Sequence, residues 1–129
     1  MILFDTTVLI DLEREFRRHI EGPATLVLTK MPEEQPAVSV ITAGEFAEGF
    51  AARTFDVFVD RLRMYTVIDI DAAIAWRYGV LSRTGRERGD RIGDNDLWIA
   101  ATAIEKHLPL LTRNVRHFSR IADLKIKTY

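Results

Sequence analysis

The sequence contains no cysteine among its 129 residues. This absence excludes a disulfide framework, a thiolate metal site and a cysteine nucleophile, and it is typical of proteins in a reducing compartment. The chain also lacks an excess of one charge, because 18 Lys and Arg residues face 19 Asp and Glu residues, for a formal net charge of −1. A strongly basic, histone-like binder is therefore excluded, and any contact with nucleic acid must come from local basic patches.

Long hydrophobic runs are missing as well. No apolar stretch approaches the roughly 20 residues of a membrane-spanning helix, and the segment Met1 to Asp5 lacks the basic start and long apolar stretch of a signal peptide. We therefore expect a soluble, cytoplasmic protein without a membrane partner. With 47% hydrophobic and 29% charged residues, the chain is predicted to form a single domain over residues 1–129.

Short apolar runs alternate with longer segments of helical periodicity. This pattern predicts an α/β fold in which strands of a parallel sheet are joined by crossover helices. We expect strands at residues 1–4, 37–41, 65–70 and 108–112, with 124–126 as the candidate fifth strand. We expect helices at 7–16, at 24–31, from 42 toward 53, after Asp71 as N-cap, and at 94–107. The glycine-rich loop at 85–93 is expected to be mobile.

The helix expected at 7–16 has a clear apolar stripe, formed by Val8, Leu9 and Leu12. Opposite this stripe the pattern places four charged residues, namely Asp11, Glu13, Arg14 and Glu15. An amphipathic helix of this kind buries its apolar stripe and exposes its charges, so these four side chains are expected on the polar face.

Polar side chains follow the expected strands at the sheet edge where parallel α/β proteins bind ligands. Asp5 follows the first strand, and Glu45 lies one turn into the helix after the second. Asp94 and Asp96 open the helix at 94–107, and Asn114 follows the fourth strand. Because these strand ends meet at one edge, the sequence predicts an acidic site there.

Each acid also has a purely structural interpretation, since every one lies at the start of an expected helix. The segment Thr42 to Glu45 fits a capping box, and the acids that open the helix at 94–107 fit its N-cap. Taken singly, each acid is better explained as a cap. Taken together they favour a site, because an unpaired carboxylate such as that of Asp5 is costly to bury after an apolar strand.

Three carboxylates that converge on one site repel one another, so without a cation at least one of them is expected to have a raised pKa. A hard divalent ion removes this conflict, and a ligand set of oxygens alone selects Mg²⁺ or Mn²⁺ over zinc. The histidines, His19, His107 and His117, have no metal-ligand spacing and are expected to be surface or cap residues. Neither common pattern of a glycine-rich nucleotide-binding loop is present in the sequence.

Four stretches of the chain carry a resemblance to a known family. They are Leu3–Ile10 (LFDTTVLI), Ser39–Phe46 (SVITAGEF), Gly93–Ala103 (GDNDLWIAATA) and Leu111–Phe118 (LTRNVRHF). In order and spacing they resemble the PIN-domain family, specifically the VapC-type toxin ribonucleases of prokaryotic toxin–antitoxin pairs. The likeness spans nearly the whole chain and implies a PIN-like three-layer α/β/α sandwich with a central parallel sheet of four to five strands.

The resemblance also implies a set of metal ligands. The three acidic ligands of the family fall on Asp5, Glu45 and Asp96, and the ion is expected to be Mg²⁺, with Mn²⁺ as a substitute. The fourth acidic position of the family is Asn114 here, which departs from the four-acid pattern and leaves the number of metal ions open. Asp94 stands where relatives often have a different residue, and we interpret it as a cap.

The activity implied by the resemblance is a metal-dependent endoribonuclease that hydrolyses RNA phosphodiester bonds. Its catalytic residues here would be Asp5, Glu45, Asp96, Asn114 and Thr7, with the Thr7 hydroxyl holding the first carboxylate or a water. The resemblance further implies a VapB-type antitoxin as partner and a homodimer.

An acidic pocket that binds RNA needs positive charge around it. Basic residues gather after the fourth strand and in the 85–93 loop, namely Arg113, Arg116, Arg120, Lys125, Lys127, Arg86, Arg88 and Arg91. Each one alone is better explained as a solvated surface charge. As a group we expect them to contact the phosphates of single-stranded RNA.

Three other functions fit the size and pattern of the chain. A receiver-like phosphoacceptor domain would place a lysine near the last strand, where this chain has Arg113 and Asn114. A phosphatase of the haloacid dehalogenase type would need a second acid two residues after Asp5, where Thr7 stands. The third alternative is a non-catalytic PIN-fold binding module that uses the acids as caps, and it would bind no divalent ion.

Overall fold

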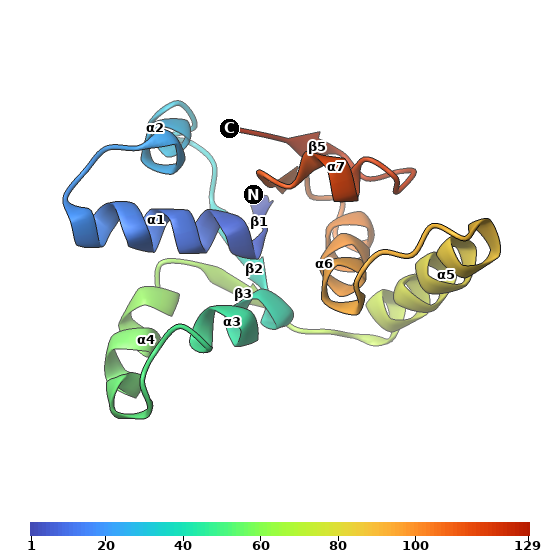
Figure 1. The fold of residues 1–129 in the computed structure, drawn as a ribbon, viewed down its shortest axis with the longest axis horizontal. Coiled ribbons are helices and arrows are strands. Elements are labelled where there is room, and N and C mark those ends of the chain that lie inside the picture. The colour runs from blue at the N-terminus through green and yellow to red at the C-terminus, as the bar shows by residue number, and fades with distance from the viewer.

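A five-stranded parallel sheet forms the centre of the protein, as described by a computed structural model (Figure 1). The structure describes all 129 residues apart from the side chain of Arg53. The strands are β1 (Ile2–Phe4), β2 (Pro36–Ser39), β3 (Thr66–Ile68), β4 (Leu110–Leu111) and β5 (Ile126–Lys127). Their order in the sheet is β3-β2-β1-β4-β5, and every neighbouring pair is parallel.

Helices cover both faces of this sheet. They are α1 (Thr6–Arg18), α2 (Pro23–Thr29), α3 (Val40–Ala47), the 3₁₀ turn η1 (Ala52–Thr54), α4 (Phe55–Leu62), α5 (Ala72–Arg88), α6 (Asp94–Glu105) and α7 (Val115–Phe118). In Figure 1, α1, α2 and α4 lie on one side of the sheet, and α5, α6 and α7 lie on the other. The expected three-layer α/β/α sandwich is therefore confirmed. None of the described helices is both long enough and apolar enough to cross a membrane.

The strands supply two separate cores because successive side chains of a strand point to opposite faces. Leu3 of β1 packs in the cluster formed with α6 and α7, whereas Ile2 and Phe4 pack in the cluster formed with α1 and α3. All three side chains are at most 1% exposed. Burying each of them contributes about 1.5–3 kcal/mol, so the central strand holds both helical layers in place.

The topology of the sheet places the candidate site at one edge. The chain leaves β1 to build β2 and β3 on one side, and later adds β4 and β5 on the other side. In parallel α/β sheets, ligands bind at the carboxyl ends of the two strands that flank such a reversal. Here those strands are β1 and β4, which are followed by Asp5 and Thr112.

Several boundaries differ from the sequence expectation. Helix α3 begins at Val40, because the Ser39 hydroxyl caps it by accepting a hydrogen bond of 3.1 Å from the amide of Ile41. The capping box expected at Thr42 is therefore wrong. Helix α5 continues through the first part of the loop expected at 85–93, and it ends where Gly89 adopts the left-handed conformation (φ 65°). The helix at 24–31 and the Asp71 cap are confirmed.

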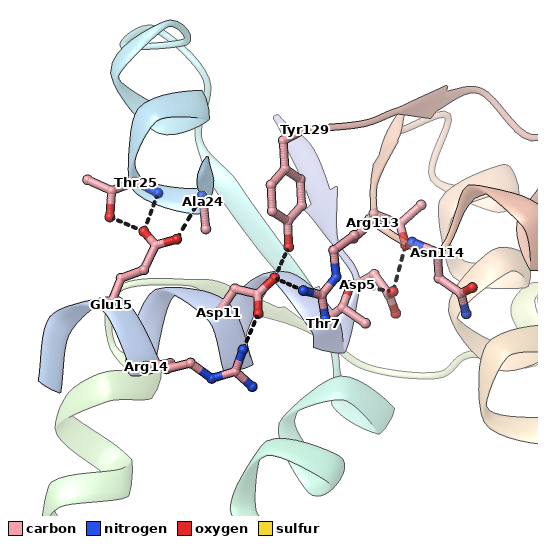
Figure 2. Close-up of polar contacts among 11 residues, drawn as sticks. Asp5, Thr7, Asp11, Arg14, Glu15, Ala24, Thr25, Arg113, Asn114 and Tyr129 are labelled. Carbon is pink, nitrogen blue, oxygen red and sulfur yellow. Dashed lines mark hydrogen bonds and ion pairs between the residues drawn. The ribbon is translucent and has the colours of Figure 1, made fainter. Parts of the chain in front are cut away.

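Two charged residues of α1 are buried, against the expectation that they lie on a solvated face. Asp11 and Glu15 are each 6% exposed. They lie four residues apart, on one face of the helix. Both carboxylates bind groups from other segments of the chain (Figure 2). The sequence pattern does not show these partners, which come from distant positions.

Glu15 joins α1 to α2 by capping the second helix. Its carboxylate accepts hydrogen bonds from the amides of Ala24 (3.0 Å) and Thr25 (2.8 Å) and from the Thr25 hydroxyl (2.6 Å). The N-cap residue of α2, Gly22, has no side chain to serve this purpose, and a Cβ there would collide with the Glu15 carboxylate. Burial acts to raise the pKa of Glu15, but these hydrogen bonds outweigh burial and lower it.

We expect Glu15→Gln to lower the free energy of unfolding by about 1 kcal/mol at neutral pH, because an amide cannot accept from all three donors. Since the pKa of Glu15 is lower in the folded state, its contribution is present at neutral pH and is lost as the pH falls below about 4. Urea denaturation at neutral pH and near pH 3 measures this. The exposed Glu21→Gln is the control, and a Glu15→Gln loss that persists unchanged near pH 3 contradicts the assignment.

Candidate active site

Asp5 lies at the end of β1 and is only 3% exposed. Its Oδ1 accepts a hydrogen bond from the Thr6 amide (2.8 Å), so Asp5 also serves as the N-cap of α1. Its Oδ2 accepts from the hydroxyls of Thr7 (3.0 Å) and Thr112 (2.7 Å). These three donors fix the orientation of the Asp5 carboxylate at the carboxyl end of the central strand.

Glu45 is held beside Asp5 by the residue that follows Asp5. The Thr6 hydroxyl donates a hydrogen bond of 2.7 Å to Oε1 of Glu45. The same hydroxyl lies 3.4 Å from the hydroxyl of Thr42, one turn earlier in α3. Thr42 therefore faces α1 instead of capping its own helix, and α3 presents Glu45 toward the carboxyl end of β1.

Asp96 lies in the first turn of α6, but it does not cap that helix. The N-cap residue is Gly93, which provides no side-chain hydrogen bond, so the expected cap among the opening acids is wrong. Asp96 is half-buried, and its Oδ2 lies 3.6 Å from Nδ1 of His117. The positive end of the helix dipole is enough to favour an acid at this position.

The negative charges of the other two candidate acids act on the Asp96 carboxyl. Burial and the negative charges of Asp5 and Glu45 raise the pKa of the Asp96 carboxyl, whereas its contact with His117 acts in the opposite direction. This is the raised pKa that the sequence predicts for at least one of three converging carboxylates. The three acids come from three separate segments, the end of β1, helix α3 and the first turn of α6.

Asp94 faces away from these acids. It is exposed, and it accepts a hydrogen bond of 3.0 Å from the hydroxyl of Tyr78 in α5. The Tyr78 ring stacks on that of Trp98, with centroids 3.9 Å apart. Asp94 thus joins α6 to α5 by a side-chain hydrogen bond and is no helix cap, which corrects the expected role.

The other two candidate residues lie beside Asp5. Thr7 donates to the Asp5 carboxylate, which is one of the two roles expected for its hydroxyl. The backbone amide of Asn114 donates a hydrogen bond of 2.9 Å to the Thr112 hydroxyl, which in turn donates to Asp5.

Sequence reasoning missed three members of this arrangement. Thr6 and Thr112 hold the carboxylates of Glu45 and Asp5, and His117, which is exposed as expected, also contacts Asp96. The available signal was position. Thr6 and Thr112 immediately follow or precede candidate site residues, and His117 comes three residues after Asn114, a spacing that one helical turn brings to the same side.

Oxygen atoms dominate the groups that could hold a metal here. Among the residues that the structure describes, no group of three or more His, Asp and Glu side chains is arranged as a ready metal site. The carboxylates of Asp5 and Glu45 accept hydrogen bonds from threonine hydroxyls instead. The donor set of carboxylates still has the chemistry that Mg²⁺ prefers, and the expected ion at Asp5, Glu45 and Asp96 stays a prediction.

A family model of the PIN domain matches residues 2–124 of the chain. The chain belongs to the PIN-domain family. This PIN domain is 34% identical to Ribonuclease VapC1 of Methanocaldococcus jannaschii over 129 residues, covering 99% of the chain and 86% of that protein. It is 30% identical to Ribonuclease VapC1 of Haemophilus influenzae strain R2866, covering 95% of the chain and 93% of that protein.

Solved structures agree with this relationship. One is the crystal structure of VapBC2 from Rickettsia felis bound to a DNA fragment from their promoter, with TM-score 0.82, 25% identity, and coverage of 100% of this chain and 99% of that chain. Another is VapBC-1 from nontypeable Haemophilus influenzae, with TM-score 0.81, 26% identity, and coverage of 99% and 98%. The PIN-like fold expected from the sequence is confirmed.

Thr112→Val removes the hydroxyl that joins the ends of β1 and β4. We expect it to lower the free energy of unfolding by about 1–3 kcal/mol, because Asp5 loses a buried donor and the Asn114 amide loses its acceptor. Thr112→Ser keeps the hydroxyl and is expected to lose less. Urea denaturation of both variants measures the difference, and equal losses for valine and serine would assign the effect to packing alone.

Proposed function

We propose that this PIN domain is a divalent-metal-dependent endoribonuclease that acts as the toxin of a VapBC-type toxin–antitoxin pair. The observation that carries the proposal is the set of threonine hydroxyls that hold the carboxylates of Asp5 and Glu45 at the carboxyl end of β1. Burial and the negative charges of Asp5 and Glu45 raise the pKa of Asp96, which supports a site shared by these three acids at the carboxyl edge of the sheet. The relatives named Ribonuclease VapC support RNA as the substrate.

The same three acids are the residues that would hold Mg²⁺ or Mn²⁺. Their donor atoms are carboxylate oxygens, and a cation between them would relieve the repulsion that raises the pKa of Asp96. When bound, such an ion lowers the pKa of a coordinated water and offsets charge on phosphate oxygens. The amide oxygen of Asn114 is available as a weak ligand or as an acceptor that orients a water.

Threonine hydroxyls hold two of the three acids in place before any ion binds. Thr7 and Thr112 restrain the Asp5 carboxylate, and Thr6 restrains that of Glu45. Each carboxylate keeps lone pairs for a cation because an ionised carboxyl group has about four acceptor positions. Carboxylates held in this way need little reorganisation when ion and substrate bind, which is how a fixed polar site stabilises a transition state.

Asp96→Asn is expected to lower the rate of Mg²⁺-dependent RNA cleavage at least about a hundredfold while leaving the fold intact. Asp94→Asn is the matched control, because Asp94 lies two residues away and binds Tyr78 instead of facing the acids. Cleavage of a single-stranded RNA, with and without a chelator, gives the rates, and calorimetry with Mn²⁺ gives ion binding. Equal cleavage and ion binding by Asp96→Asn and the wild type would refute the site.

We further propose that the antitoxin docks on the side of the sheet that carries α1, α2 and α4. An apolar groove of about 430 Å³ lies between these helices, and its lining includes Leu12, Phe16, Ile20, Leu28 and Met64. Phe16 and Met64 are 60% and 67% exposed. Exposed apolar patches of this kind mark partner surfaces, and the solved relatives are VapBC complexes. The expected homodimer stays a prediction.

Phe16→Asp is expected to abolish copurification with the antitoxin on coexpression, because a charge in the groove opposes burial of an apolar segment. Phe55→Asp is the matched control, since Phe55 is 67% exposed but does not line the groove. Affinity purification of the pair checks this, with RNA cleavage of the free toxin confirming that the variant is folded. Undiminished copurification of Phe16→Asp would exclude the groove.

A further inference from the structure

A buried carboxylate next to the acidic site binds three groups from three segments. Asp11 of α1 accepts a hydrogen bond of 2.8 Å from the Tyr129 hydroxyl at Oδ2, and Nη1 of Arg113 lies 3.2 Å from the same oxygen. Its Oδ1 is 3.2 Å from Nη1 of Arg14. The Asp11 side chain is 7% exposed, so solvent screens these contacts little. Figure 2 shows all three partners converging on Asp11.

The composition of this cluster leaves it positively charged. One carboxylate faces two guanidinium groups, and the Tyr129 hydroxyl stays protonated at neutral pH because burial and its bond to Asp11 raise its pKa. Asp11 contacts only Nη1 of the Arg113 guanidinium. A guanidinium carries five N–H donors, so others remain. The Arg113 side chain is 55% exposed, so its remaining donors are open to an anion.

Arg113 directly follows a residue that contacts the candidate site. Arg113 lies between Thr112, whose hydroxyl binds Asp5, and Asn114, whose amide binds Thr112. In the view of Figure 2 its guanidinium lies between Asp11 and Asp5. Two other basic residues expected to bind RNA pair with exposed or half-buried acids, since Arg120 lies 2.8 Å from Asp90 and Lys127 lies 3.9 Å from Glu34. Arg113 differs from these two because its partner, Asp11, is a buried carboxylate.

We propose that Arg113 binds a phosphate of the RNA at the cleavage site, and that Asp11 and Tyr129 are positioning residues that hold its guanidinium. The proposal rests on the ribonuclease function proposed above. Asp11 restrains one side of the guanidinium, and Tyr129 shares the carboxylate oxygen that Arg113 contacts. Arginine suits this role because its planar fork presents paired donors to phosphate oxygens.

The first experiment measures RNA binding in the Asp96→Asn background, in which cleavage is blocked. Arg113→Ala is expected to weaken the affinity for a single-stranded RNA oligonucleotide roughly tenfold. It should also reduce the slope of log affinity against log salt by about 0.7, the value for one phosphate contact on a single strand. Arg113→Lys should restore most of the slope. The control is Arg63→Ala, because Arg63 precedes β3 at the opposite edge of the sheet and pairs with Asp60.

The second experiment tests positioning with a double-mutant cycle on the cleavage rate at saturating RNA. Tyr129→Phe removes only a hydroxyl, and we expect it to lower kcat roughly three- to tenfold when Arg113 is present and to have no further effect in Arg113→Ala. Thermal unfolding of each variant measures stability separately. A purely structural hydroxyl would change stability in both backgrounds without this coupling in kcat.

The outcomes separate the inference from the function it rests on. If the wild type does not cleave RNA, the proposed ribonuclease function is overturned. Cleavage by the wild type, with an unchanged salt slope in Arg113→Ala, would overturn the phosphate contact. Equal effects of Tyr129→Phe on kcat in both backgrounds would overturn the positioning role. A decrease in kcat that occurs only when Arg113 is present supports it.

Discussion

The hydrogen bond from the Thr112 hydroxyl to the Asp5 carboxylate is the interaction on which the site depends. It joins the ends of β1 and β4, the two strands at which the chain reverses its direction across the sheet. Both residues are almost fully buried. A buried carboxyl group is costly unless several hydrogen-bond donors contact it. The donors to Asp5 come from the start of α1 and from Thr112 at the end of β4, so the site forms only where these segments come together.

The same constraint explains why a residue can be a helix cap and a site residue at once. Asp5 caps α1 through one oxygen and meets threonine hydroxyls through the other. Asp96 stands at the positive end of α6 without capping it, where the dipole offsets part of the repulsion from Asp5 and Glu45. The N-termini of helices thus stabilise neighbouring acids before any cation is bound. For this reason a single acid fits both a structural role and a site role, whereas acids at several strand ends favour a site.

Sequence reasoning reached the layers and the strands because these depend on local patterns, whereas the metal-binding role of the acids stays a prediction. Apolar runs located β1 and β2, and strand ends located Asp5 and Glu45. It missed Ser39 as the cap of α3 because two short hydroxyl residues, Ser39 and Thr42, compete for that role. Thr112 and His117 were missed because their partners lie far away in sequence, and only the folded sheet brings them together.

Helix α1 shows where periodicity alone misleads. Its pattern placed Asp11 and Glu15 among solvated charges, yet both are buried. Glu15 fixes the start of α2, and Asp11 fixes Tyr129 and Arg113. Burying an acid at each of two successive turns costs desolvation free energy, and only specific hydrogen-bond and ion-pair partners offset that cost. This face of α1 therefore favours the one arrangement of neighbouring segments that supplies those partners. The helix that begins with Asp5 therefore also determines how the basic side of the site is placed against its acidic side.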